Sequence, residues 1–198
     1  LAPGRARAQV DLSGNWRPEP YVQLVPNGPA PGDFVGVPLN ADGRAAAATA
    51  NANEESEELN RQCQPWMIYY LLDGPFGMEF RPVADPLNGN HILAWRIEGT
   101  VDRPSLTIWI DGRAPPSMQA VHTWGGFATG EWHGSTLAVS ITHLKDGWLL
   151  RNAAPASNQA TVSLLLSREG NMLTETFIIH DPVYLSEAYP RARALELT

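Results

Sequence analysis

Residues 122–152 read HTWGGFATGEWHGSTLAVSITHLKDGWLLRN, and this stretch decides the fold. Apolar residues alternate with polar ones on both sides of a central glycine, which is the pattern of two paired strands with one buried face. His133-Gly134 predicts a two-residue turn between the strands, because glycine readily adopts the positive φ that a type I′ turn requires. The sequence therefore predicts a β-hairpin at this place.

Counting outward from that turn predicts which residues face each other. Trp124 is placed opposite His143, and His122 opposite Lys145. Because side chains alternate along a strand, the apolar face of this hairpin should point inward, and its three small residues should leave space for a ligand. The inward face is predicted to consist of His122, Trp124, Gly126, Ala128, Gly130 and Trp132 on the first strand and Leu137, Val139, Ile141 and His143 on the second.

Short apolar segments recur about every ten residues from position 66 onward, with turn residues between them, as in a barrel or sandwich. Closure into a barrel would remove exposed strand edges. The predicted strands are residues 13–17, 66–72, 76–82, 91–101, 105–111, 120–132, 136–144, 147–151, 161–168 and 172–180.

The first part of the chain differs from the rest. A loop rich in proline and glycine spans residues 17–38, and one helix is predicted within residues 40–59 with Asn40 as its N-cap. The glutamates of residues 54–58 are interpreted as the solvated face of this helix. The fold class is thus all-β, an antiparallel barrel with one helix and a long N-terminal loop. Residues 11–198 form one domain after a leader or tail of residues 1–10.

Composition excludes several classes of protein. The 198 residues carry a net charge of −7 with no cluster of basic residues, so nucleic acid is not an expected partner. No apolar run is long enough to span a bilayer, and Cys63, the one cysteine, permits no intramolecular disulfide. The chain has neither GxGxxG nor a P-loop, so no cofactor is expected.

The start of the chain predicts export. Ala6-Arg7-Ala8 before Gln9 is similar to the end of a secretory signal, which places the protein in the periplasm or outside the cell. The alternative is an ordinary leader rich in alanine and arginine.

The histidines on the predicted apolar face are the first candidates for chemistry. Imidazole titrates near neutrality and is a common metal ligand, so His122 and His143 are candidates for a general acid/base pair or for two metal ligands. The alternative is that both are core histidines whose ring nitrogens are satisfied by hydrogen bonds. Their spacing is neither HxH nor HxxxH, so it indicates no metal site by itself.

A second hairpin, centred on Glu169-Gly170, places Glu175 opposite Leu164 within an apolar face. An isolated buried carboxylate is costly unless it is paired or protonated. Glu175 is therefore predicted to meet a cation such as Arg96 or His143, or to line a wet cavity.

The remaining candidates contact a ligand rather than react with it. They are aromatic or charged residues. The tryptophans of the first hairpin strand lie on its inward face, whereas Lys145, Trp148 and Arg151 follow His143 and would lie near the mouth of the barrel. They are Trp124, Trp132, Asp111, Arg113, Lys145, Trp148, Arg151 and Arg96. Asp111 and Arg113 are alternatively an ion pair in a turn.

Gly14-Asn15-Trp16 resembles the Gly-x-Trp opening of the lipocalin and calycin barrels. Over roughly residues 14–190 the chain also resembles a group of uncharacterised, often exported bacterial proteins. The shared elements are DGRxPP (111–116), HTWxGFxTGxW (122–132), THLKxGW (142–148), RN (151–152) and DPVYL (181–185). The resemblance implies a lipocalin-like barrel and no particular activity. Members carry an acidic and then a basic residue where this chain has Leu164-Leu165, so the carboxylate at Glu175 represents a change of strand.

Three functions remain open from these residues. The first is an exported barrel that binds a small apolar or aromatic molecule and acts on it as a cofactor-independent lyase, dehydratase or isomerase. His143 would be the base, with His122 or Glu175 as its acid or orienting partner. The second is a barrel that binds a small ligand or carbohydrate without catalysis. The third is a metalloprotein with the two histidines as ligands. The oligomeric state does not follow from the sequence.

Overall fold

The structure is a computed structural model that describes part of the chain. The described residues are 10–18, 34, 36–49, 67–74, 76–99, 105–149 and 153–198. Residues 1–9 of the predicted leader, most of the proline-rich loop, the glutamates of residues 54–58 and Arg151 lie outside them.

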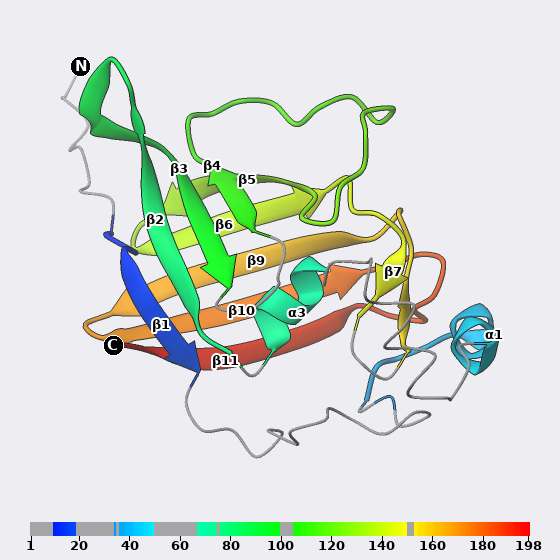
Figure 1. Cartoon of the computed structure of the whole chain (residues 1–198). Helices are drawn as coiled ribbons and strands as arrows, with labels where there is room; N and C mark the ends of the chain where they lie inside the picture. The colour runs from blue at the N-terminus through cyan, green and yellow to red at the C-terminus, as the bar shows by residue number, and fades with distance from the viewer. Residues whose placement is uncertain are drawn as a thin grey trace.

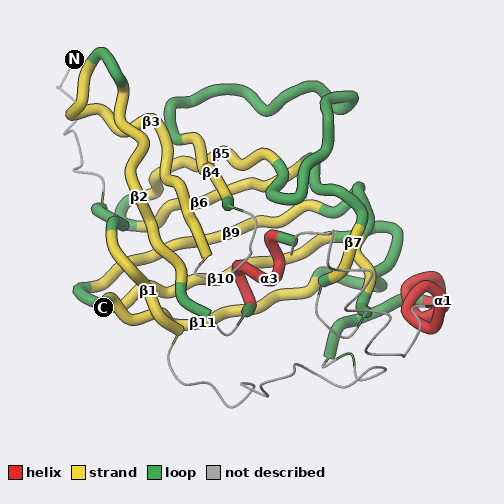
Figure 2. The backbone as a smooth tube through the Cα atoms, in the orientation of Figure 1, coloured by secondary structure: helices red, strands yellow, loops and turns green. Residues whose placement is uncertain are grey.

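Nine strands in this part of the chain close into one barrel, in the order β1-β11-β10-β9-β6-β5-β4-β3-β2 (Figures 1 and 2). Pairing of β1 with both β2 and β11 closes the ring. The all-β barrel is therefore confirmed. The barrel strands are β1 (Gly14–Pro18), β2 (Met78–Asp85), β3 (Asn88–Gly99), β4 (Leu106–Trp109), β5 (Phe127–His133), β6 (Thr136–Thr142), β9 (Thr161–Glu169), β10 (Met172–His180) and β11 (Tyr189–Leu197).

Three further elements complete the described fold. The strands β7 (Gly147–Trp148) and β8 (Pro155–Ala156) pair as a small separate sheet. Helix α1 (Ala41–Thr49) begins after Asn40, whose side chain accepts a hydrogen bond from the backbone of Gly43 at 2.8 Å, so the predicted N-cap is confirmed. Helix α3 (Ile68–Asp73) lies beside β10 and β11 in Figure 1.

Two details of the prediction were wrong. Strand β4 pairs with β5 in parallel, so the barrel is not wholly antiparallel. Parallel neighbours need a long connection, and the chain between β4 and β5 makes a wide loop over the barrel (Figure 1). Residues 66–72 were expected to form a strand, but α3 occupies this stretch, so the described chain has two helices and not one. A short apolar run is compatible with either structure.

Both predicted hairpins exist, with turns one residue later than expected. His133 pairs with Thr136, and Glu169 pairs with Met172, so Gly134 and Gly170 each occupy the first central position of a turn. Both glycines have positive φ, whereas the residues that follow them do not. Glycine at the first position is the requirement of a type II′ turn rather than type I′. The glycine thus fixes the turn type and, with it, the register.

The barrel core consists of the side chains that the strand alternation points inward. The largest that are fully buried are Trp16, Trp95, Phe80 and Phe177. Helix α3 adds its own apolar side chains, and Leu71 and Leu72 have no exposed surface. The helix therefore packs as part of the core and covers the inner side of β11.

Candidate functional site

The two predicted histidines do come together, although not in the predicted register. Their ring centroids are 5.2 Å apart. Strand β5 begins only at Phe127, so His122 and Trp124 lie before it and are not paired with β6 as expected. Instead Thr123 bridges Leu144, and the backbone of Thr123 donates to the carbonyl of His143 at 2.9 Å.

His143 is held by hydrogen bonds at both ring nitrogens. Nε2 lies 2.9 Å from the carbonyl oxygen of Ser117, and a carbonyl can only accept, so Nε2 donates. Nδ1 lies 2.8 Å from Oγ1 of Thr142 and accepts its hydrogen. His122 uses Nδ1 on the carbonyl of Leu144 at 2.7 Å. His143 therefore fastens the loop at Ser117 and has no free nitrogen to act as a base or a metal ligand.

The small residues of β5 do not create the expected cavity. A Cβ atom at Gly130 would come within 2.9 Å of Ile108 and 3.0 Å of Leu137. A Cβ at Gly126, which has a positive φ, would come within 2.5 Å of the carbonyl oxygen of Thr142 and 2.9 Å of Leu144. Neighbouring atoms already occupy the space above both glycines, so the prediction of a ligand cavity beside the histidines was wrong.

The other predicted contact residues are dispersed. Asp111 and Arg113 form an exposed ion pair at 2.6 Å that holds the pKa of Asp111 below its usual value, chiefly through the hydrogen bond from Arg113. Lys145 lies 5.0 Å from the ring of the half-buried Trp124, and Trp148 is half-buried in β7. Trp132 packs against the core. They do not converge on one ligand.

Arg96 was expected to face inward and pair with Glu175, and this was wrong. Trp95 and Ile97 are the buried neighbours in β3, so Arg96 points outward, where it donates to Glu98 at 2.6 Å. Arg96 therefore lies on the outer face of the barrel, whereas Glu175 lies on the inner face.

Glu175 is the predicted site residue whose surroundings are most unusual. Its side chain has no exposed surface, and it lies on β10 between Leu166 of β9 and Arg193 of β11 in the strand register. Oε2 accepts from Nε of Arg193 at 3.0 Å. Burial raises the pKa of Glu175 to about 7, against the attraction of Arg193, which lowers it. Glu175 thus meets a cation, as predicted, but the cation is Arg193.

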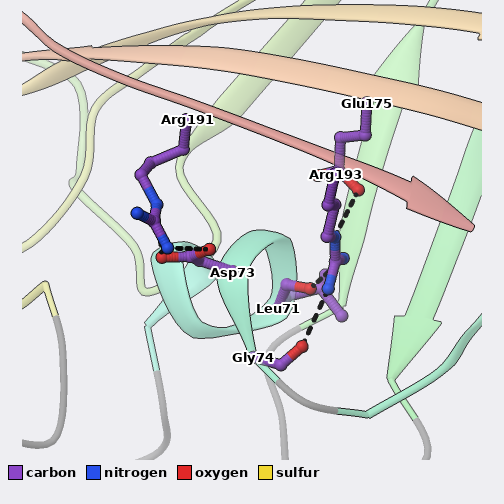
Figure 3. A network of polar contacts seen from close by, with 6 residues as sticks. All are labelled: Leu71, Asp73, Gly74, Glu175, Arg191 and Arg193. Carbon is purple, nitrogen blue, oxygen red and sulfur yellow. Dashed lines mark hydrogen bonds and ion pairs between the residues drawn. The ribbon is translucent and has the colours of Figure 1, made fainter. Parts of the chain in front are cut away.

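Arg193 joins three elements through one guanidinium group. Besides Glu175, it donates to the carbonyl of Gly74 at 2.8 Å and to that of Leu71 at 2.9 Å, both at the C-terminal end of α3 (Figure 3). Carbonyls at a helix C-terminus lack intrahelical partners and carry partial negative charge, which a cation satisfies. Arg193 therefore attaches the helix to the barrel wall and leaves Glu175 with one oxygen bonded.

A second ion pair lies beside the first. Arg191 reaches from β11 to Asp73, the last residue of α3, at 3.1 Å (Figure 3). Burial raises the pKa of Asp73, while Arg191 lowers it. Tyr189, two residues earlier on the same inward face, also has a raised pKa, mainly because it is buried. The inner side of β11 thus supplies two cations and a phenol.

Several buried polar atoms in the described residues have no hydrogen-bond partner. They include Oε1 of Glu175 and the hydroxyl groups of Tyr69 and Tyr189. Tyr69 lies on α3, and its burial, together with the nearby charge of Asp181, raises its pKa. Buried polar groups are normally paired, so an unpaired carboxylate oxygen and phenols are the atoms by which a small molecule would be recognised.

Five residues around Glu175 and α3 were not predicted from the sequence: Tyr69, Asp73, Tyr189, Arg191 and Arg193. The signal available was the alternation in YPRARALEL, residues 189–197, in which every second residue shares one face. Two arginines stand where apolar residues were expected, so the stretch was not recognised as a strand. Glu175 was the one buried charge that the pattern identified.

Three further observations concern the described residues. No three His, Cys, Asp or Glu side chains gather as a possible metal site within the part of the chain that the structure describes. No helix among those residues is both long and apolar enough to cross a membrane. An open hollow of about 470 Å³ lies on the surface between β1 and residues 76–78, and none of the predicted site residues lines it.

Comparisons with known proteins add no relative. No protein-family model matches the chain, and neither a curated protein nor a solved structure was found to be similar to it. The class that the fold defines is a closed, mostly β barrel. The resemblance to an exported bacterial family and to the lipocalins remains a prediction.

Proposed function

We propose that the protein is a barrel that binds a small, largely apolar molecule in its interior, with Glu175 as the polar group that contacts the ligand. The observation that carries the proposal is Oε1 of Glu175, which is buried and has no hydrogen-bond partner in the described residues. Leaving such an atom unpaired costs roughly 1–3 kcal/mol, which a ligand donor would recover. The site is thus moved from the histidines to the inner wall of the barrel beside α3.

The apolar side chains around Glu175 support this class of ligand. Leu166 and Phe177 are both buried, and Leu166 faces Glu175 in the strand register. Ligand pockets in proteins combine apolar walls with a few polar groups that fix the orientation of the ligand. One carboxylate among leucine and phenylalanine side chains has this composition.

The test uses the fluorescent probe N-phenyl-1-naphthylamine, an apolar molecule with one N–H group. We expect saturable binding of about one probe per chain, a stoichiometry suited to a single interior site. We also expect the ¹³C signal of the Glu175 carboxyl carbon, assigned by its loss in Glu175→Gln, to move as the probe is added. The carboxyl of Glu131, whose side chain is 83% exposed, is the internal control and should not move. Binding that leaves the Glu175 signal unchanged would refute the proposed site.

One observation favours catalysis as a second candidate function. A carboxyl group with a pKa of about 7 is suited to proton transfer near neutral pH. We propose Glu175, rather than His143, as the base of a lyase or isomerase. A generic probe is 5-nitrobenzisoxazole, in which removal of the ring C–H proton breaks the N–O bond and releases a cyanophenolate. The rate should rise with pH through about 7 and be lost in Glu175→Gln. A rate equal in both proteins would exclude Glu175 as a base.

A further inference from the structure

The charges around Glu175 compensate one another. In the described residues, two carboxylates and two guanidiniums meet at the C-terminal end of α3, as the ion pairs Glu175–Arg193 and Asp73–Arg191. The N–O distances are 3.0 and 3.1 Å, so each carboxylate has its own cation. A charged ligand would bring an unbalanced charge into an interior that solvates ions poorly. The electrostatics therefore favour a neutral ligand.

The carboxylate of Glu175, when it is ionised, can only accept hydrogen bonds. An ionised carboxylate has no hydrogen to donate, and Oε2 of Glu175 is already engaged by Arg193. Oε1 is the remaining oxygen, and it is buried. The guanidinium of Arg193 is directed to Glu175, Leu71 and Gly74. A ligand reaching Oε1 must therefore bring the hydrogen itself.

The side chains around Glu175 indicate that the rest of the ligand is apolar. The inward positions on either side of Glu175 along β10 are Leu173 and Phe177, and both are buried. Leu166 stands opposite Glu175 on β9. A ligand in contact with these side chains exposes apolar groups to them, except at the single point where it meets the carboxylate.

We infer that the ligand is an uncharged, mainly apolar molecule with an O–H or N–H group that donates to Oε1 of Glu175. This inference rests on the proposed function and specifies the chemical class of the ligand. A phenol or an aliphatic alcohol of similar size belongs to this class, whereas its methyl ether does not. A carboxylate of the same shape lacks both the neutrality and the donor.

The experiment compares 4-propylphenol, 4-propylanisole and 4-propylbenzoate as competitors of N-phenyl-1-naphthylamine at pH 8, where the phenol is neutral. With the wild-type chain we expect the phenol to displace the probe at a concentration about 10- to 100-fold lower than the ether, as for a hydrogen bond to a charged acceptor. The benzoate should be the weakest of the three. In Glu175→Leu, the phenol and the ether should displace the probe at nearly the same concentration. The matched surface variant Glu131→Leu should keep the wild-type difference between the two concentrations.

Each result has one meaning. Equal displacement by phenol and ether from a chain that binds the probe would overturn this inference and leave the proposed function standing. Stronger displacement by benzoate would overturn the requirement for a neutral ligand. Failure of the probe to bind would overturn the proposed function and this inference with it. The wild-type comparison needs no variant, so the test remains decisive even if Glu175→Leu does not fold.

Discussion

Glu175→Gln should change the way in which stability depends on pH. Glutamine has nearly the same shape and cannot titrate, so the difference between the two proteins isolates the carboxyl of Glu175. A carboxyl whose pKa is higher in the folded chain than in the unfolded chain binds its proton more tightly when folded. The free energy of unfolding is then highest at acidic pH and falls as the pH rises through this range.

The magnitude follows from the buried position of the residue. The pKa of Glu175 is raised from 4.5 to about 7, which corresponds to roughly 3 kcal/mol between acidic and neutral pH. Relative to Glu175→Gln, wild-type stability should therefore decline between about pH 4.5 and 7 and remain level above that. Asp73 also has a raised pKa, but its contribution is present in both proteins.

Urea unfolding followed by tryptophan fluorescence from pH 4 to 8 measures this difference. Glu131→Gln is the matched control, because it removes an exposed carboxyl and should leave the wild-type profile unchanged. If the wild-type and Glu175→Gln profiles stay parallel over the whole range, Glu175 is not a buried carboxyl with a raised pKa, and the reasoning is refuted.

Three further substitutions test the packing and the ion pairs. Arg193→Met should lower the free energy of unfolding, measured with urea at pH 8, by about 3–5 kcal/mol. Adding Glu175→Met should restore part of this free energy. A double variant no more stable than Arg193→Met would show that the pair is not coupled. His143→Asn, which tolerates the positive φ of 57°, should cost about 1–2 kcal/mol and increase amide exchange in residues 111–121; unchanged exchange would contradict the anchoring at Ser117. Gly130→Val should cost about 1–3 kcal/mol in the same assay through overlap with Ile108; an equally stable variant would reveal space there.

The faces of the two hairpins were predictable even though the turns were not. Placing a turn one residue too early displaces each strand partner by two positions, and a two-residue shift preserves the face because side chains alternate. Ala128, Gly130 and Trp132 therefore share a face with Val139 and its neighbours, as expected. For the same reason Glu175 lies on the inner face of β10, as predicted.

The partner of Glu175 could not be predicted because its strand has an unusual pattern. Inward positions of strands are usually apolar, but β11 has arginines at 191 and 193. Asp73, Glu175 and the carbonyls of α3 offset their cost, and these groups come from distant parts of the chain. The alternation of apolar and polar residues within one segment does not reveal distant ion-pair partners. For this reason neither β11 nor its ion pairs were predicted.

The histidines illustrate a different limit. Their proximity was predicted, yet their role depended on the backbone carbonyls of Ser117 and Leu144, which a side-chain pattern does not locate. Hydrogen bonds to these carbonyls hold both imidazole rings in place. Export to the periplasm or beyond, and the resemblance to an exported family, remain predictions.

The most direct test of Glu175 as the ligand-binding group is a pH titration of its ¹³C carboxyl signal, with and without saturating N-phenyl-1-naphthylamine. The structure predicts a midpoint near 7 in the free protein. With the probe bound, the midpoint should fall, because an N–H group that donates to Oε1 stabilises the ionised carboxylate. A midpoint near 4.5 in the free protein, or one that the bound probe does not change, would contradict the assignment of Glu175 as the ligand-binding group.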